Sequence, residues 1–577
     1  MNQRLRTLLI LAATLSAACA PPTAPRTAEP SAPGQPAPPV VPNRALVVLA
    51  RGEPPSFALR AFTQAGGNSN SYTVLNASLD EVDEGGTPHP LLAEALPQVN
   101  TDSWRVFPDG RMETTYRLKP NLVWHDGTPL AAEDFAFAWR VYATPALGTS
   151  GSAPVAQMED ATAPDNRTLV LRWRQPYAGA GVLRALAQIE GFQALPRHIL
   201  EQPFLQGDYE AFANHPFWTR EYIGLGPYRL DRWEPGASMD AVAFDRYVLG
   251  RPKIDRLHIL FVTDANAAVA SLLSGDGHIA MDYLVMYEQG STLQQQWAAN
   301  NAGTVLFSPL LVRVSVFQFR PELMATPAVL DLRFRRALAH AMDKVGLNEA
   351  LMGGQAIVAD GFLSPRASYY ASIEAAITRY PYDPRRAQQL LDEAGLQRGA
   401  DGFYLGPDGR PFQMEVMVLQ NPSSESENAI IVEGYNRIGV NAVTRLLPVP
   451  LFSDGQIRAS YTGILTTGGV GFEQDMSRYS TGKISKPETR WQGTNYGAWT
   501  NEAYDRLWDS YNSTLAPAEQ VRQLAQMEKI LSEELPAIHM FYTPLITPYV
   551  AALAGPALRS SRTADNLTHI HEWQWRF

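Results

Sequence analysis

The chain has 577 residues; one hydrophobic core stops growing at roughly 250–300 residues, so we expect two or more packed units. Apolar residues make up 45% of the sequence and charged residues 18%, a composition that excludes a largely disordered chain. The 58 acidic side chains outnumber the 48 basic ones and give a net charge of −10, which argues against nucleic acid as a partner, because such binding needs a basic face.

The first 19 residues have the pattern of an export signal. Two arginines precede an apolar run at 8–18, which is too short to span roughly 30 Å of hydrocarbon as a permanent helix. The only cysteine, Cys19, follows directly, and its solitary use excludes an intramolecular disulfide and a cysteine-based metal site. Residues 1–19 resemble a bacterial lipoprotein signal peptide that is lipidated at Cys19. Conventional cleavage near Ala18 or Ala20 is the alternative.

Residues 20–43 are rich in proline and have almost no large side chains. Such a segment cannot bury enough surface to offset its ordering entropy, so we expect an extended tether. No run of 18 apolar residues follows it. We therefore expect an exported protein that is lipid-anchored to the cell membrane, on the periplasmic or outer face.

Short strands are expected along the folded part. An apolar strand is expected at 45–49, half-buried strands with alternating polarity at 112–118 and 169–173, and further apolar strands at 259–262 and 414–419. Strands and helices mix without strict alternation, which favours α/β or α+β lobes.

Capping residues mark four helices. Aspartate or asparagine precedes apolar residues spaced three to four apart, and glycine or proline follows. The expected helices cover 331–353, 383–395, 501–508 and 521–531.

Five groups of motifs follow one another along the chain. They are LAEA at 92–95 with YRLKP at 116–120 and VWHDGTPLAAEDF at 123–135; LPRHIL at 195–200; GLGPYRL at 224–230 with WEPG at 233–236; DLRFRRALAHAMD at 331–343; and NEAYD at 501–505. In this order they resemble the family 5 extracellular solute-binding proteins, the peptide/nickel/opine class that feeds ABC importers.

The resemblance implies an α/β fold of the periplasmic-binding-protein type, type II, with two lobes, an extra inserted subdomain and a ligand cleft between the lobes. The segments map as 44–78, 216–304 and 541–577 for the base of the first lobe, 79–215 for the inserted subdomain and 305–540 for the second lobe. The chain would cross between the lobes near 307–317 and 541–550, which are both apolar and strand-like.

Most residues of the motifs are expected to be structural. In the segment 124–127, Asp-Gly favours a turn, Trp124 packs, and His125 makes a local hydrogen bond. No nucleophile motif accompanies this His-Asp pair, which argues against catalysis.

Three loops have side chains suited to a ligand. The predicted ligand contacts are Asn68, Asn70 and Tyr72 in the first loop, Phe472, Glu473 and Asp475 in the second, and Trp491, Asn495 and Tyr496 in the third. The second and third loops match the region that commonly lines the pocket in the family. The Trp-x-x-Asp-Tyr pattern of peptide-binding members is missing there, but Glu473 or Asp475 would suit a peptide ammonium. A sugar would instead use the rings of Trp491 and Tyr496 with nearby amides.

The predicted function is the capture of an oligopeptide-like or other small oligomeric solute and its delivery to an ABC permease. The protein is expected to be a monomer, not an enzyme, and to need no cofactor. The two histidines of 569–571 share one face of an expected strand, but two imidazoles alone do not make a metal site. A nickel chelate bound through its organic part stays open.

Two rival functions remain. One is a secreted hydrolase that attacks an oligosaccharide or peptide through paired carboxylates, with Glu473 and Asp475 as the nearest pair, although G-x-S-x-G and H-E-x-x-H motifs are missing. The other is a binding lobe that signals to a receptor without transport.

Overall fold

The computed structural model describes residues 45–54, 56–57, 73–149, 153–184, 191–448, 451, 454–489, 491, 493–560 and 566–576. The signal segment with Cys19, the tether and the loop that carries Asn68, Asn70 and Tyr72 lie outside these ranges. All described residues belong to one contact unit, 44–577.

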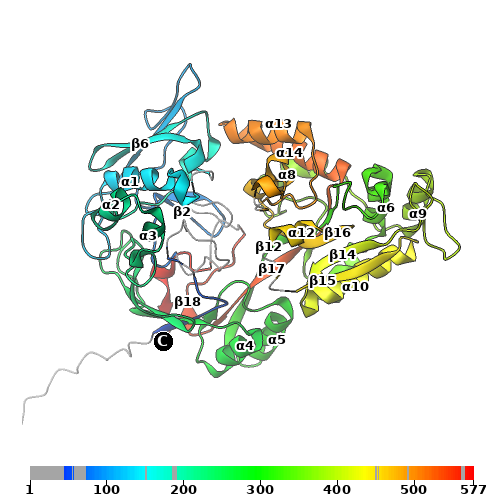
Figure 1. The fold of residues 1–577 in the computed structure, drawn as a ribbon. Helices are drawn as coiled ribbons and strands as arrows, with labels where there is room; N and C mark the ends of the chain where they lie inside the picture. The colour runs from blue at the N-terminus through cyan, green and yellow to red at the C-terminus, as the bar shows by residue number, and fades with distance from the viewer. Residues whose placement is uncertain are drawn as a thin grey trace, which may run out of the picture. The chain divides into compact units, whose positions relative to one another are not determined.

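One mixed sheet connects most of the strands in the described ranges (Figure 1). Its order is β15 (Ala442–Leu447), β14 (Met414–Leu419), β16 (Ile464–Gly469), β12 (Gly303–Phe317), β17 (Ala537–Val550), β11 (Ile279–Ala280), β1 (Leu46–Ala50), β10 (Arg256–Phe261), β9 (Ser238–Ala243) and β8 (Tyr228–Glu234), and β13 (Ile357–Val358) also pairs with β17. Strands β14, β15 and β16 are mutually parallel, as are β1, β10 and β11. The apolar strands expected at 45–49, 259–262 and 414–419 are confirmed as β1, β10 and β14.

The long strands β12 and β17 pair antiparallel and join the two parallel groups. Their register runs from Gly303 opposite Val550 to Val316 opposite Ala537, with irregularities after Pro309, which faces Pro544, and between Arg313 and Val314. Both strands are mostly buried. The expected strand-like segments at 307–317 and 541–550 are therefore strands.

Smaller sheets flank the main one. Strands β4 (Trp104–Val106), β5 (Met112–Arg117), β7 (Thr168–Trp173) and β6 (Met158–Asp165) form an antiparallel sheet in that order, which α1 (Ala132–Tyr142) contacts through β6 and β7. Two pairs complete the set: β2 (Asp80–Val82) with β3 (Pro88–Pro90), and β18 (Leu553–Ala554) with β19 (Gln574–Trp575). Met112, Thr114 and Tyr116 are buried in β5 as its alternation predicts.

Capping side chains set where the helices begin. The remaining α-helices are α2 (Arg197–Leu205), α3 (Tyr209–Ala213), α4 (Ala265–Ser274), α5 (Tyr287–Ala298), α6 (Leu332–Ala341), α7 (Lys344–Met352), α8 (Tyr370–Ile373), α9 (Pro384–Glu393), α10 (Pro422–Arg437), α12 (Gly455–Ala459), α13 (Glu502–Ser513) and α14 (Pro517–Glu534). Asp383 caps α9 by accepting from the N–H groups of Arg385 and Arg386, and Asn501 caps α13 by accepting from Tyr504 N–H. The helices expected at 383–395, 501–508 and 521–531 are confirmed.

The single helix expected at 331–353 is wrong. The chain forms two helices, α6 and α7, because Met342 is extended (ψ 109°) and ends the first. Asp343 then accepts a hydrogen bond from Gly346 N–H (2.8 Å) and caps the second. A capping aspartate inside an apolar helical pattern was the signal for this break.

The motif at 124–127 forms the expected turn, with Trp124 buried and Gly127 at φ 94°. The hydrogen bonds of His125 are not local, however. Its Nδ1 accepts from Gly224 N–H (3.1 Å), and its Nε2 lies 3.1 Å from the Gly226 carbonyl oxygen, so two motifs of the chain contact each other. Burial lowers the pKa of His125 to about 4, and both ring nitrogens are occupied, which fits a structural role.

Buried apolar side chains in the described ranges form separate clusters. The largest joins residues of 46–281 with residues of 549–573. Two others draw on 317–541 and on 312–542. Strands β12 and β17 contribute to different clusters at their two ends. Val305 of β12 and Ile546 of β17 belong to a fourth cluster together with Leu49 of β1, whereas Phe317 and Ile538, at the other end, belong to the 317–541 cluster.

A buried histidine makes stability depend on acid pH. His539 of β17 lies 3.0 Å from the Tyr479 hydroxyl through its Nε2, and burial lowers its pKa to about 3. The unfolded chain takes up a proton below about pH 6.5, whereas the folded chain does not. The contribution of His539 is therefore complete above pH 6.5 and is lost as the pH falls toward 3.

Urea denaturation of the wild type and of His539→Gln tests this dependence. Between pH 7.5 and pH 5 the free energy of unfolding should fall by about 2 kcal/mol more in the wild type than in the variant, because glutamine keeps an acceptor for Tyr479 but does not titrate. Equal falls in the two proteins would contradict the assignment.

Candidate functional site

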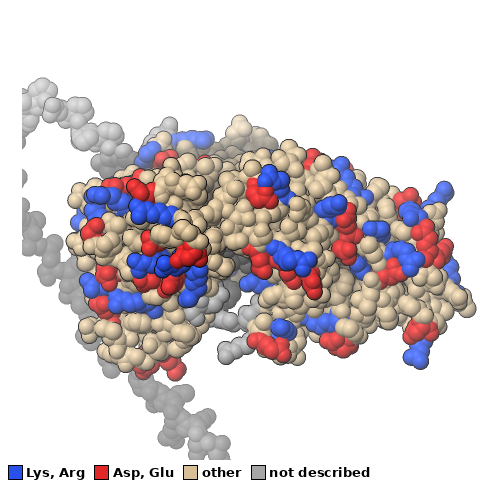
Figure 2. All heavy atoms as spheres, turned by 90° about the horizontal axis from the view of Figure 1, so that it is seen from above, with Lys and Arg blue, Asp and Glu red and all other residues tan. Residues whose placement is uncertain are grey.

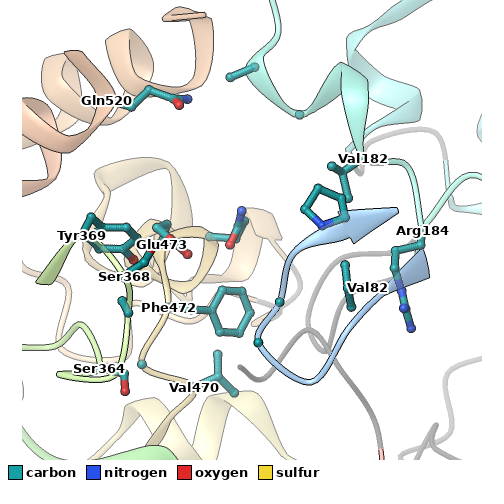
Figure 3. A pocket seen from close by; sticks show the side chains of 18 of the residues that line it. Val82, Val182, Arg184, Ser364, Ser368, Tyr369, Val470, Phe472, Glu473 and Gln520 are labelled. Atoms are coloured by element: carbon teal, nitrogen blue, oxygen red, sulfur yellow. The ribbon is translucent and has the colours of Figure 1, made fainter. Parts of the chain in front are cut away.

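A cavity of about 370 Å³ lies between two groups of segments far apart in the sequence (Figure 3). We call the first group the 82–184 wall; it comprises Val82, Gly85, Gly86, Pro88, Pro154, Tyr177, Ala178, Gly179, Val182, Leu183 and Arg184. The second group, the 364–520 wall, comprises Ser364, Arg366, Ala367, Ser368, Tyr369, Val470, Gly471, Phe472, Glu473, Gln474, Tyr511, Asn512 and Gln520. Leu310 of β12 and Ser560 complete the lining in the described part of the chain.

The segment 470–474 follows directly after β16 and is part of the 364–520 wall. Gly471 has φ 62°, a conformation that side chains beyond glycine rarely adopt, and it turns the loop out of the sheet. Asp475 is buried and holds this turn: it accepts from Val470 N–H (2.9 Å) and pairs with Arg478 (3.0 Å). Phe472 and Glu473 therefore line the cavity from the 364–520 wall, and Val82 and Val182 line it from the 82–184 wall (Figure 3).

The cavity combines apolar surface with few charges. Among its described lining residues, Glu473, Arg184 and Arg366 are the charged ones. Burial raises the pKa of Tyr369, and the negative charge of the nearby Glu473 carboxylate raises it further. Burial also raises the pKa of Tyr177, to about 12. Both phenols therefore stay neutral at pH 7. The charged lining residues are one carboxylate and two arginines, so the cavity suits a small molecule that carries both a positive and a negative group.

Of the predicted ligand contacts in the described ranges, Phe472 and Glu473 line the cavity. Asp475 lies behind the loop. Asn495 is buried and donates to the carbonyl groups of Ser480 (3.1 Å) and Trp499 (2.8 Å), and the Tyr496 ring lies 4.4 Å from the Arg458 guanidinium. Trp491 has φ 59° and accepts from the Ser485 hydroxyl (3.0 Å).

Asn495 and Tyr496 line a different cavity of about 10 Å³. The structure thus brings two of the predicted side chains together and places four elsewhere, and the ligand contacts remain predictions.

Sequence reasoning missed the whole 82–184 wall and the segment 364–369. Two local signals were present: the Gly85-Gly86 turn between β2 and β3, and the run of small residues at 178–181, which forms a 3₁₀ turn. Neither signal indicates which distant segment it faces. The cavity depends on contacts between residues about 300 positions apart, which local patterns do not encode.

The histidine pair of 569–571 does not lie on a strand, so that expectation is wrong. His569 has φ 56°, which interrupts extended structure, and residues Ile570–Glu572 form a 3₁₀ turn. His569 pairs with Glu84 (3.2 Å). In the described ranges, no group of three or more His, Cys, Asp or Glu side chains is arranged to hold a metal ion.

Acidic and basic side chains intermingle on the face seen in Figure 2. Exposed ion pairs also occur among the described residues, for example between Arg251 and Asp255 (2.6 Å). Where the chain is described, no helix has the length and apolar character needed to cross a membrane.

Comparison with known proteins gives a consistent result. The family model "Bacterial extracellular solute-binding proteins, family 5 Middle" matches residues 87–489. A Brucella suis protein named for ABC-transporter peptide binding is 27% identical over 355 residues, and this match covers 61% of the chain and 60% of the relative. The chain thus spans three fifths of the length of that relative. The oligopeptide-binding protein AppA of Bacillus subtilis is 24% identical over 500 residues, with 86% of each chain covered.

Solved structures share the fold. NikZ from Campylobacter jejuni, in complex with Ni(L-His), superimposes with a TM-score of 0.74 at 20% identity and covers 92% of this chain and 100% of its own. AppA from Bacillus subtilis, in complex with a nonapeptide, gives a TM-score of 0.71 at 21% identity, with 92% and 99% covered. The expected mixed α/β fold of the periplasmic-binding-protein type is confirmed.

The carboxylate pair of the hydrolase alternative is not available as a pair, since Asp475 is committed to Arg478 and to the Val470 amide, and the matched family is one of solute-binding proteins. Because the family model matches more than half of the sequence, the chain belongs to the bacterial extracellular solute-binding proteins, family 5.

Proposed function

We propose that this protein captures a short peptide, or a peptide-like molecule with both charges, and delivers it to the permease of an ABC importer. The observation that carries the proposal is Glu473, which lines the cavity beside Phe472 and is the one carboxylate among the described lining residues. A carboxylate in such surroundings is a strong partner for an ammonium group, because the low local dielectric strengthens the pairing. The names of the Brucella suis and Bacillus subtilis relatives support the peptide class.

The size and lining of the cavity favour a small ligand. Its volume of about 370 Å³ is near the lower end of the range for small-molecule pockets, about 300–1,000 Å³. Val82, Val182 and Leu310 offer apolar surface for side chains, and Arg366 offers positive charge for a carboxylate. We therefore expect a ligand of two or three residues.

We infer that two lobes close over the ligand. The proposed first lobe has its base at 44–78, 216–304 and 541–577 and its inserted subdomain at 79–215, and the second lobe is 305–540. The separation of the largest apolar cluster from the two clusters that draw on 312–542 supports the division between the two lobes. A ligand that contacts both walls only in the closed arrangement favours closure. Micromolar affinity corresponds to about −8 kcal/mol, which is enough to shift a modest equilibrium between lobes.

The family places the protein outside the cytoplasm, in an extracellular or periplasmic location. We infer further that Cys19 carries the lipid anchor and that residues 20–43 act as the tether of a monomeric binding protein. Stable anchoring requires more than one acyl chain, because a single chain gives only marginal membrane binding.

Calorimetric titration of protein that has been unfolded, freed of ligand and refolded tests the proposal. We expect trialanine to bind with micromolar affinity and to reduce the radius of gyration in small-angle scattering. Maltotriose and a nickel–histidine complex serve as matched probes of the sugar and chelate alternatives. Binding of either of these without binding of trialanine would overturn the peptide class, and tight binding without compaction would overturn the closure of the lobes.

A further inference from the structure

Each wall of the cavity is attached to a buried carboxylate that does not itself line the cavity. Asp80 of β2 is 1% exposed, and its Oδ1 accepts from the N–H groups of Leu183 (2.8 Å) and Arg184 (3.1 Å). Glu528 of α14 is fully buried, and its Oε1 accepts from the N–H groups of Phe362 (3.0 Å) and Leu363 (2.6 Å). The same arrangement therefore occurs once on each side of the cavity.

On the 82–184 wall, Asp80 fixes backbone that contributes directly to the lining. Leu183 and Arg184 both line the cavity, and so does Val82, which lies two residues after Asp80. Side chains two apart in a strand point to the same face, so Asp80 lies on the face of β2 that is turned toward the cavity (Figure 3 shows Val82 and Arg184 on this side). Its second oxygen, Oδ2, is buried without a hydrogen-bond partner in the described ranges.

On the 364–520 wall, Glu528 fixes the backbone immediately before the lining segment. Leu363 is followed by Ser364, whose N–H donates to the Gly471 carbonyl (2.9 Å) and so joins the two parts of this wall. A Cβ atom at Gly361 would lie 2.9 Å from Glu528 Oε2, so glycine permits the close approach of the carboxylate. The segment continues to Tyr369, which lies close enough to Glu473 for that carboxylate to raise the pKa of the phenol.

A gain in stability is a weak explanation for why carboxylates occupy these two buried positions. Neither forms an ion pair with a cation in the described ranges, and burying a carboxylate without such a partner costs free energy. Burial accordingly raises the pKa of Asp80 to about 6 and that of Glu528 to about 7. Each carboxylate, however, accepts two backbone N–H groups at one oxygen, which fixes the direction of a loop more firmly than apolar packing does.

We propose that Asp80 and Glu528 are positioning residues, each of which sets the geometry of one wall and thereby the affinity for the ligand. The proposal rests on the proposed function for its affinity readout. Glu528 acts on Glu473 through the segment 361–369 and Tyr369. Asp80 acts through Leu183 and Arg184.

The chain offers a matched control in Asp134. This aspartate is also buried, accepts from the N–H groups of Ala131 (2.9 Å) and Arg197 (3.1 Å), and is not part of the cavity lining. Asp134→Ala should therefore lower stability in the same way as Asp80→Ala and Glu528→Ala without altering the cavity.

The first readout is hydrogen exchange of the ligand-free protein, which needs no ligand. Asp80→Ala should raise exchange at 182–184, and Glu528→Ala at 362–369, each at least tenfold and each only in its own wall. The second readout is the affinity for trialanine, which both variants should weaken at least tenfold and Asp134→Ala should leave within twofold. Asp80→Asn and Glu528→Gln keep the accepting oxygen and should restore affinity to within about threefold of the wild type.

If Glu528→Ala fails to fold, Glu528→Asp replaces it, because aspartate shortens the reach of the side chain by one methylene and keeps the charge. Glu528→Asp should weaken trialanine binding at least fivefold. Unchanged exchange in both walls, or equal losses of affinity in Asp134→Ala, would overturn the positioning role. If the wild type binds no trialanine, the proposed function fails, and the exchange data still decide the positioning role on their own.

Discussion

Glu473→Gln is expected to weaken the binding of trialanine at least 30-fold while binding of N-acetyl-trialanine stays unchanged. Asp475 still holds the loop through Val470 N–H and Arg478, so the loop keeps its shape, but the ammonium group of the peptide loses its counter-charge. Removing one partner of a desolvated charge pair costs about 2–5 kcal/mol, and 2 kcal/mol corresponds to about 30-fold in affinity. Calorimetry at pH 7 measures both peptides.

The matched control is Glu488→Gln, which changes an exposed glutamate that does not line the cavity. It has the same change of charge and should leave both affinities unaltered. The acetylated peptide separates the ammonium from the rest of the ligand: in the variant the two peptides should bind equally. A variant that still prefers trialanine by the wild-type margin would remove Glu473 from the ammonium site.

Arg559→Met is expected to lower the free energy of unfolding by about 3–5 kcal/mol. The Arg559 guanidinium lies 2.6 Å from Asp282 Oδ1, with side-chain exposures of 3% and 0%. Asn566 donates to the same oxygen (2.8 Å). Removal of one partner of a buried ion pair leaves a desolvated charge behind, which is the costly case. Urea denaturation at pH 7 measures the loss.

Arg251→Met provides the comparison, because Arg251 is also 2.6 Å from its carboxylate, Asp255, but both side chains are more than two-fifths exposed. That variant should lose less than about 1 kcal/mol. The double change Arg559→Met with Asp282→Asn should recover part of the loss, since it removes the remaining charge. Similar losses in Arg559→Met and Arg251→Met would show that burial does not control the energy of this pair.

This ion pair also has a place near the site. Arg559 N–H donates to the Ser308 hydroxyl of β12 (3.3 Å), and the next residue, Ser560, lines the cavity and donates through its N–H to the Glu84 carbonyl (3.0 Å). The C-terminal segment is thereby fastened to β12 and to the β2–β3 turn.

Local elements of the fold were predictable from the sequence, because their causes are local. Alternating polarity in β5 reflects one buried face, and the caps Asp383 and Asn501 satisfy N–H groups within the same turn. The error at Met342 arose because the apolar spacing continues across the break while Asp343 starts a new helix. The pairing of β12 with β17 is different, since it joins residues more than 200 positions apart, and the family resemblance, not the local pattern, pointed to the two segments.

The candidate site was predictable only in part. Phe472 and Glu473 were found because their loop matches a pocket-lining region of the family. Asp475 and Asn495 carry equally suitable groups in the sequence, but in the structure these groups are consumed by Arg478 and by backbone carbonyls. Composition tells which groups a loop contains, whereas burial and tertiary contacts determine which of them are left for a ligand.

The most direct measurement is native mass spectrometry of ligand-free protein mixed with equal amounts of dialanine, trialanine, hexaalanine, N-acetyl-trialanine and maltotriose. The account predicts one-to-one complexes with dialanine or trialanine, weaker signals for hexaalanine and the acetylated peptide, and loss of the preference for a free amino group in Glu473→Gln. A complex with maltotriose alone, or equal occupancy by trialanine and its acetylated form in the wild type, would contradict it.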